Sequence, residues 1–174
     1  MRKYTVPNPS TAASLNNLAG LLRTQGDLAG AQPLRERALA IREKVLGPEH
    51  RLTVWTLNGL ARVFQDSGDL PAARTLFERA LTIYKKTLAH PSTNIGRYLF
   101  AGLLLAEGNA VEALRESEAA LPGLEKAFGK KNQWTKDAAR ITTDALDAVG
   151  RAEEAAALRA RYGVELGQIY SRAP

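Results

Sequence analysis

Apolar residues recur along the chain at intervals of three and four, the spacing that places side chains on one face of an α-helix. The first two such stretches are Leu15, Leu18, Ala19 and Leu22, and Leu57, Leu60, Ala61 and Phe64. This is a helix period and not the strict alternation of a half-buried strand. The pattern therefore predicts an all-α chain.

Threonines and glycines divide this pattern into pairs of helices. The first helix of each pair is expected to begin after a threonine, whose hydroxyl can accept a bond from the first-turn amides. It is expected to end at a glycine, which adopts a left-handed turn at low cost. The threonines are Thr11, Thr53, Thr93 and Thr135, and the glycines are Gly26, Gly68, Gly108 and Gly150. The second helices are expected at about residues 29–45, 71–88, 110–127 and 152–162.

The pairs are copies of one another. A shift of 42 residues places Leu15-Asn16 on Leu57-Asn58 and Gly26-Asp27-Leu28 on Gly68-Asp69-Leu70. A third copy follows after a linker two residues shorter, and a fourth, fainter copy runs from Thr135 to Leu158. Since neither helix of a pair can bury its apolar stripe alone, we expect successive pairs to stack.

The first copy resembles a tetratricopeptide repeat in Leu15-Asn16-Asn17-Leu18-Ala19, Gly26-Asp27-Leu28 and Leu46-Gly47-Pro48-Glu49-His50. The 42-residue period is similar to that of the kinesin light chain subclass. The resemblance covers about residues 9–160. It implies an alpha solenoid, a right-handed alpha-alpha superhelix of about four helix-turn-helix units, that binds a protein or peptide on its concave face.

These patterns predict six segments of the chain. They are an N-terminal extension or linker at 1–10, repeats at 11–50, 51–90 and 91–132, a degenerate fourth repeat at 133–162, and a tail at 163–174. Polar Thr142-Thr143 stand where Leu18-Ala19 stand in the first repeat, and Arg97 takes a leucine position. We therefore expect the fourth repeat to face water as a cap. In the tail, apolar spacing from Val164 to Tyr170 allows one or two more helical turns, which could cover the last repeat or trail free.

Composition removes several classes of protein. With no cysteine among 174 residues, the chain has no disulfide, thiolate zinc site or thiol nucleophile. No apolar run approaches the length of a membrane span, and the first residues carry no secretory signal pattern. We therefore expect a cytoplasmic protein. The net charge of +6 permits an acidic partner, but no Lys/Arg tract points to nucleic acid.

Candidate binding residues follow the stripe beside the apolar face of each first helix. They are Asn16, Arg23, Trp55, Asn58, Arg62, Tyr98 and Arg140. Asparagine can donate to and accept from a peptide backbone, arginine can hold a carboxylate, and Trp and Tyr supply contact area. The resemblance implies that Asn16 and Asn58 hold an extended peptide.

Structural roles for the same residues remain open. Trp55 could pack under a neighbouring helix, and the asparagines could be repeat residues with no ligand. Arg140 could pair with Asp137 or Asp144 on its own helix. The stripe is basic near Arg23 and acidic near Asp144, so the acidic end of a peptide is expected toward the first two repeats.

We find no motif for catalysis, a metal ion or a cofactor. His50 and His90 occupy the same place in two linkers, so the repeat explains them. The sequence therefore predicts a non-enzymatic scaffold for a protein or peptide. Self-association to a homo-oligomer is the alternative, and nucleic-acid binding through net charge is a weaker one. Steep salt dependence would mark the last, and a concentration-dependent mass would mark self-association.

Overall fold

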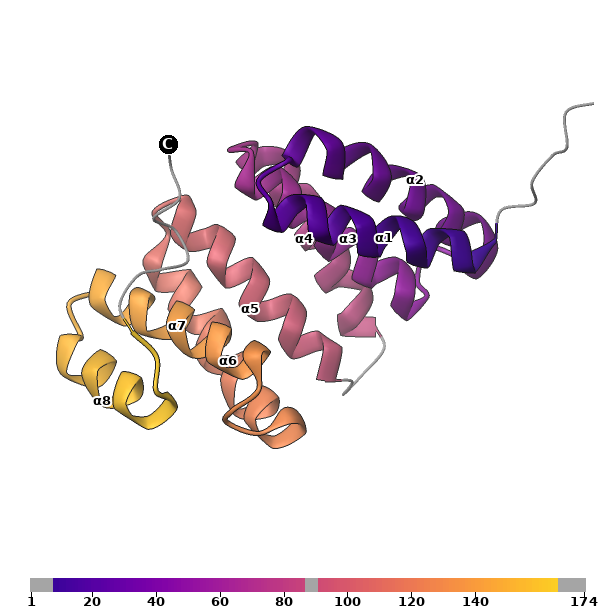
Figure 1. Ribbon diagram of the computed structural model, residues 1–174. Helices are drawn as coiled ribbons and strands as arrows, with labels where there is room; N and C mark the ends of the chain where they lie inside the picture. The colour runs from indigo at the N-terminus through magenta and orange to yellow at the C-terminus, as the bar shows by residue number, and fades with distance from the viewer. Residues whose placement is uncertain (1–7, 87–90, 166–174) are drawn as a thin grey trace, which may run out of the picture. The chain divides into compact units, whose positions relative to one another are not determined.

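The computed structural model describes residues 8–86 and 91–165 and shows only helices there, so the all-α prediction is confirmed (Figure 1). The helices are α1 (Pro9–Thr24), α2 (Leu28–Leu46), α3 (Arg51–Asp66), α4 (Leu70–Lys86), α5 (Pro91–Ala106), α6 (Ala110–Phe128), α7 (Gln133–Ala148) and α8 (Ala152–Tyr162). They form four helix pairs, as the four repeats in the sequence predict.

The four repeated glycines make the turns inside the pairs. Each adopts the left-handed conformation, with φ of 85° at Gly26, 84° at Gly68, 80° at Gly108 and 81° at Gly150. A side chain with a Cβ would be strained at these angles. The prediction that glycine ends each first helix is confirmed.

The prediction that threonines cap the first helices is wrong. In the three first helices whose caps are described, the helix begins two residues before the threonine, and the caps are Asn8, His50 and Asn132. Asn132 Oδ1 accepts from the amide of Trp134 at 2.9 Å. Thr53 lies inside α3, where its hydroxyl donates to the carbonyl of Gly47 at 2.8 Å. Thr53 thus ties α3 to its linker, Thr135 is buried and Thr11 is exposed, and an earlier polar residue caps each of these helices.

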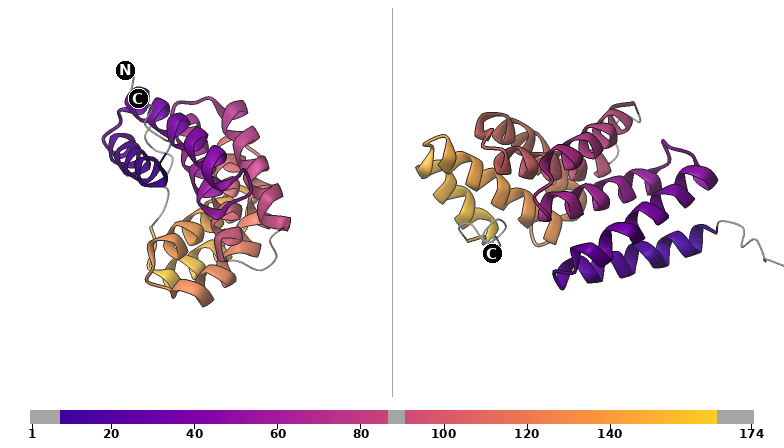
Figure 2. Two further views of the ribbon diagram at one scale, coloured as in Figure 1. Left: turned by 90° about the vertical axis from the view of Figure 1, so that its right-hand side faces the viewer. Right: turned by 90° about the horizontal axis from the view of Figure 1, so that it is seen from above.

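The chain divides into two compact units, residues 1–83 and 84–174. In the first unit α1 and α2 lie side by side as an antiparallel hairpin (Figures 1 and 2), and α2 also packs against α3. Ala19 of α1, Ala31 of α2 and Val63 of α3 form a buried cluster. The small side chains of Ala19 and Ala31 let the helices approach closely.

The second unit has a larger aromatic and aliphatic core. Ile95 and Tyr98 of α5, Leu124 of α6, Ile141 of α7 and Tyr162 of α8 belong to one buried cluster. Because all four helices contribute to it, the last two pairs are held by a shared core. The edge-on contact of Phe128 with Trp134, at 4.9 Å between ring centroids, packs beside this core.

The unusual polar residues of the second unit are accommodated in two ways. Thr142 and Thr143 are buried, which contradicts the expectation that they face water. Their hydroxyls donate back to carbonyls of α7, at 2.8 Å to Ala138 and to Arg140, and so lose no hydrogen bond on burial. Arg97 remains one-third exposed and reaches Glu116 of α6, with 3.8 Å between Nε and Oε2.

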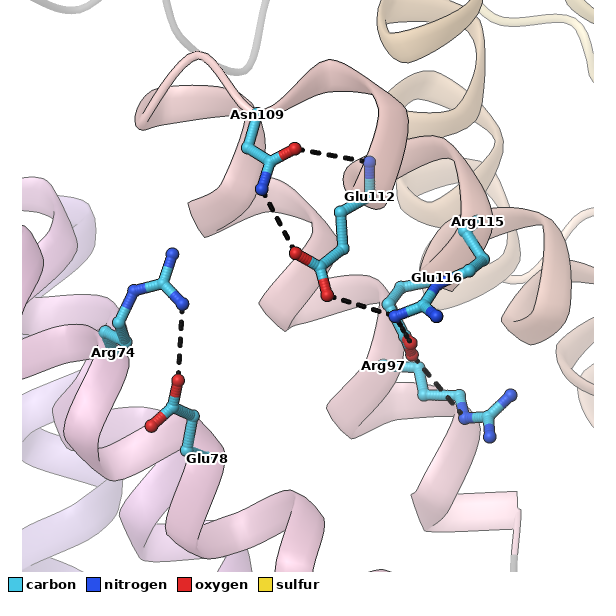
Figure 3. A network of polar contacts seen from close by, with 7 residues as sticks. All are labelled: Arg74, Glu78, Arg97, Asn109, Glu112, Arg115 and Glu116. Carbon is cyan, nitrogen blue, oxygen red and sulfur yellow. Dashed lines mark hydrogen bonds and ion pairs between the residues drawn. The ribbon is translucent and has the colours of Figure 1, made fainter.

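Glu116 belongs to a surface network that joins α5 to α6 (Figure 3). Arg115 Nη2 lies 3.5 Å from Glu116 and 3.0 Å from Glu112, and Glu112 accepts from the α6 cap Asn109 at 3.1 Å. Each charged side chain of this network pairs with a charge of opposite sign within it, so we assign the network a structural role.

Only the start of the predicted tail is described. Gly163 ends α8 in the left-handed conformation, and Val164 is buried in the core of the second unit. The remaining apolar residues of the predicted tail helix, Leu166, Ile169 and Tyr170, lie outside the described residues.

Candidate functional site

A guanidinium is buried between three helices of the first unit. Arg35 extends from the middle of α2 and is only 8% exposed. Its Nη1 donates to Asn16 Oδ1 of α1 at 2.7 Å, which is a bond to a neutral amide. Among the described residues, its Nε has no acceptor and no carboxylate pairs with it. A buried cation without a carboxylate is costly, so this group needs an explanation.

The bond to Asn16 continues as a chain of polar side chains. Asn16 Nδ2 donates to Thr56 Oγ1 of α3 at 3.1 Å, and Thr56 also accepts from Arg42 Nη1 at 2.7 Å. Arg42 in turn donates to the carbonyl of Leu52 at 2.7 Å. Two arginines of α2 are therefore linked through side chains of α1 and α3, with no negative charge in the chain of bonds.

Glycine makes room for the guanidinium on both sides. A Cβ added to Gly59 of α3 would lie 2.5 Å from Arg35 Cζ, closer than two atoms can pack. On the other side, a Cβ added to Gly20 of α1 would lie 3.6 Å from Arg35 Nη2. Because Gly20 and Gly59 carry no side chain, only backbone flanks the charge there.

The surroundings of Arg35 are themselves positive. Its pKa is lowered to about 10, first by burial and then by repulsion from other arginines. Those arginines are Arg23, Arg62 and Arg42. Burial also lowers the pKa of Arg42. We call Arg23, Arg35 and Arg62 the arginine cluster.

Two of the predicted binding residues are turned inward. Asn16 is buried, and its amide accepts from Arg35 and donates to Thr56 rather than facing solvent. Asn58 of α3 is also buried. A peptide-holding role for these amides is untested and stays a proposal.

Three predicted residues of the first unit reach the surface to different degrees. Trp55 is 39% exposed and Arg62 is half-buried, and both lie on α3 seven residues apart. In the described residues Arg62 makes no hydrogen bond or ion pair. Arg23 is paired across to α3, with 2.5 Å between its Nη1 and Asp66 Oδ2.

The two predicted residues of the second unit have local partners. Tyr98 is 3% exposed and packs in the core of that unit. Arg140 lies 2.9 Å from Asp137 on its own helix, the ion pair that the sequence left open. The structure therefore gathers Asn16, Arg23 and Arg62 around Arg35, whereas Tyr98 and Arg140 belong to the other unit.

Arg35 itself is not among the residues that the sequence analysis selected. The residues predicted from the sequence all lie on first helices, and Arg35 lies on a second helix. A signal was present, because the same repeat position holds Phe77 and Ser117, both fully buried. A charged residue at a position that is buried in other copies marks a site with a special role.

Other kinds of site are not apparent where the structure describes the chain. His50 is used as a helix cap, its Nδ1 accepting from the amide of Leu52 at 3.2 Å, and His90 lies outside the described residues. Over residues 8–86 and 91–165, no three metal-binding side chains come together. None of the described helices is both long and apolar enough to cross a bilayer.

A tetratricopeptide repeat family model matches residues 10–86, which hold the first two helix pairs. None of the curated proteins matches this sequence closely enough to count as a relative.

Solved structures match most or all of the chain. One is a protein of Podosopora anserina described as a kinesin light chain with nearly identical tetratricopeptide-like repeats. It is 27% identical over 89% of this chain and 74% of its own, with a TM-score of 0.77. A single-substitution variant of it is 26% identical over 93% of this chain and 77% of its own, with a TM-score of 0.71. BtubC of P. vanneervenii shares the fold alone, at 18% identity over 100% of this chain and 72% of its own, with a TM-score of 0.74.

Proposed function

Since the chain is a tetratricopeptide-repeat protein of the kind seen in kinesin light chains, we propose that it is a scaffold that binds a partner polypeptide through the first helices of its repeats. Repeat folds of this type bind proteins or peptides in general. The proposal adds the face, which is the stripe of α1 and α3 that carries Arg23, Trp55 and Arg62.

The observation that supports this face best is the pair Trp55 and Arg62. Seven residues apart, they lie on one side of α3. Trp55 exposes a large ring, and Arg62 is a cation with no bond or ion pair in the described residues. Trp and Arg are the residues most often found at the energetic centre of an interface.

The proposal is tested with the double variant Trp55→Ala, Arg62→Ala. Tagged wild-type and variant proteins are used as baits in extracts of the source cell, and captured proteins are quantified by mass spectrometry. We expect at least one partner to be captured by the wild type and lost with the double variant.

A control variant removes one arginine and one exposed apolar side chain from α2 instead of α3. Arg37 and Val45 are exposed residues of α2, and Val45 is 43% exposed. The double variant Arg37→Ala, Val45→Ala should capture the same partners as the wild type. Equal capture by all three baits would contradict the proposed face.

Self-association remains a second candidate because of an exposed apolar strip on α1. Leu18 is 48% and Leu21 is 55% exposed. In the next repeat the same positions are Leu60 and Val63, which are buried, and Val63 packs with Ala31 of the preceding helix pair. An additional helix pair packed against α1 would cover both leucines, and a second copy of the chain could supply it.

A further inference from the structure

We propose that the arginine cluster of Arg23, Arg35 and Arg62 is a carboxylate-binding site that receives an acidic side chain of the bound polypeptide. This inference rests on the proposed function and names the chemistry that its ligand must have. It adds a residue of a second helix, Arg35, to a binding face otherwise built from first helices.

The strongest argument is the missing counter-charge of Arg35. Its guanidinium carries five N–H groups, and the described residues provide it with one acceptor, the neutral Asn16 amide. The charge is nine-tenths buried, and the charged groups that lower its pKa are the arginines Arg23, Arg62 and Arg42. A carboxylate brought by a ligand would neutralise the charge and accept the unused donors.

The fourth helix pair gives the aligned arginine a counter-charge from within the protein. Gly26 and Gly150 align, so Arg35 corresponds to Arg159 of α8, and Arg23 corresponds to Asp147 of α7. Arg159 and Asp147 form a direct ion pair. In the first pair the position of that carboxylate holds Arg23, which is itself paired with Asp66 of α3, so Arg35 receives no carboxylate from α1.

The glycines on both sides keep other side chains away from the charge. Gly20 and Gly59 leave helix backbone, without side chains, next to Nη2 and Nη1 of Arg35. Arg62 adds a cation without a bond or ion pair in the described residues, one turn beyond Gly59 on α3. The side chain of a glutamate or aspartate carries the one negative charge that Arg35 lacks.

A peptide carboxylate fits this arrangement better than the backbone of a nucleic acid. Nucleic-acid binding depends on several cations that follow a row of phosphates. Here the charge is concentrated at one buried guanidinium, and the sequence contains no Lys/Arg tract. The two possibilities differ in their dependence on Arg35, which makes them separable by experiment.

The probe for the test is a fluorescein-labelled peptide of ten glutamates, with a peptide of ten glutamines as the uncharged comparison. Fluorescence anisotropy is measured with wild type, Arg35→Met and Arg37→Met at constant ionic strength. Met fills the space of the arginine stem without charge. Arg37 lies on the exposed side of the same helix, so both variants have the same net charge.

We expect the glutamate peptide to bind the wild type and the glutamine peptide to bind much more weakly. Arg35→Met should weaken binding of the glutamate peptide about tenfold or more, the effect of one charge-assisted bond. Arg37→Met should change it less than about twofold. A wild type that fails to bind the glutamate peptide overturns the site, and so does an equal loss in the two variants, because that outcome is general charge attraction.

A second variant tests the position of the guanidinium and keeps its charge. Gly59→Ala places a methyl group against Arg35 Cζ, so the guanidinium must move. Binding of the glutamate peptide should fall although the net charge is unchanged. Circular dichroism melting of each variant confirms that it is folded. Binding at wild-type strength in a folded Gly59→Ala protein would contradict the proposed geometry.

The same baits separate this inference from the proposed function. If a cellular partner is lost with Trp55→Ala, Arg62→Ala but captured fully by Arg35→Met, the scaffold proposal stands and the carboxylate site is wrong. If the glutamate peptide depends on Arg35 but no cellular partner depends on Trp55 and Arg62, the site stands and the proposed binding face is wrong.

Discussion

At the scale of the residue, Arg35 shows how a single buried charge can be explained by function rather than stability. A guanidinium that is removed from water and bonded to one neutral amide weakens the folded state. Its pKa is lowered to about 10 for the same reason, because burial makes the charged form less stable. Hydrophobic residues of similar volume would fit a core position better, as Phe77 does in the second repeat.

We therefore expect Arg35→Met to stabilise the free protein. The lowered pKa corresponds to a penalty on the order of 3 kcal/mol, and loss of the bond to Asn16 returns about 1 kcal/mol of it. Urea unfolding followed by circular dichroism should show a gain of about 1–2 kcal/mol. Arg37→Met, on the exposed side of α2, should stay within about 0.5 kcal/mol of the wild type. A large loss of stability in Arg35→Met would mean that the guanidinium is a structural group.

Tyr162 is a second residue whose surroundings change its ionisation. Its hydroxyl donates to Glu125 Oε2 at 2.6 Å, and Arg161 Nη2 lies 2.9 Å from the same oxygen. Burial, followed by the bond to Glu125, raises the pKa of Tyr162 to about 12 from its ordinary value of 10.0. The bond from Tyr162 is also the largest cause that lowers the pKa of Glu125.

The raised pKa of Tyr162 predicts a pH dependence of stability. Below pH 10 the phenol is protonated in both the folded and the unfolded state, so its contribution is fully present. Between pH 10 and about 12 only the unfolded state loses the proton, so stability falls with rising pH. In Tyr162→Phe the free energy of unfolding should therefore fall less across this range. Identical pH profiles for the two proteins would contradict this assignment.

At the scale of the element, caps and linkers decide where each helix begins. Asn8, His50 and Asn132 each accept a bond from the amide two residues later. The threonines that the sequence analysis chose lie in the first turn, one turn too late to act as caps. The periodicity of apolar residues locates a helix well, but several polar residues near its start are chemically able to cap it. Only the path of the linker decides between them.

Two aligned threonines give a direct test at this scale. Thr53 donates to the Gly47 carbonyl, whereas the buried hydroxyl of Thr135 has no partner in the described residues. Thr53→Val should cost about 1 kcal/mol of unfolding free energy, and Thr135→Val should cost nothing or stabilise slightly. Chemical denaturation of both variants measures the difference. Equal costs would show that the hydroxyls have the same role in both repeats.

At the scale of the whole molecule, the chain is two compact units, each held by helices that pack on their neighbours in sequence. Among the described helices, α1 packs against α2 and α3. Leu18 and Leu21 are exposed on α1, whereas their counterparts Leu60 and Val63 are buried, and Val63 packs with Ala19 and Ala31 of the preceding pair.

The exposed strip on α1 predicts self-association at high concentration. Sedimentation equilibrium of the wild type should show a mass that rises with concentration. Leu18→Glu, Leu21→Glu should stay at the mass of one chain, because two charges would be buried at the contact. Val111, 74% exposed on α6, provides the control, and Val111→Glu should behave as the wild type. A constant monomer mass for the wild type would remove the second candidate function.

The sequence by itself determined the helices, their pairing and the repeat. These features depend on the local period of apolar residues and on glycines such as Gly26 that end a helix, and both act over a few residues. The surroundings of the candidate binding residues were only partly predictable. Helical spacing placed Trp55 and Arg62 on one side of α3 correctly. It could not show that Asn16 would be buried and bonded to side chains of α2 and α3.

The tertiary structure decided which side chains meet between helices. Arg35 becomes a candidate ligand-binding group only because packing of α2 against α1 and α3 buries it between Gly20 and Gly59 and denies it a carboxylate. The physical reason is that the energy of a charge depends on all the groups around it, whatever their distance in sequence. A repeated position can therefore hold Phe77, Ser117, an ion-paired Arg159 or a buried Arg35, and only the fold shows what each one does.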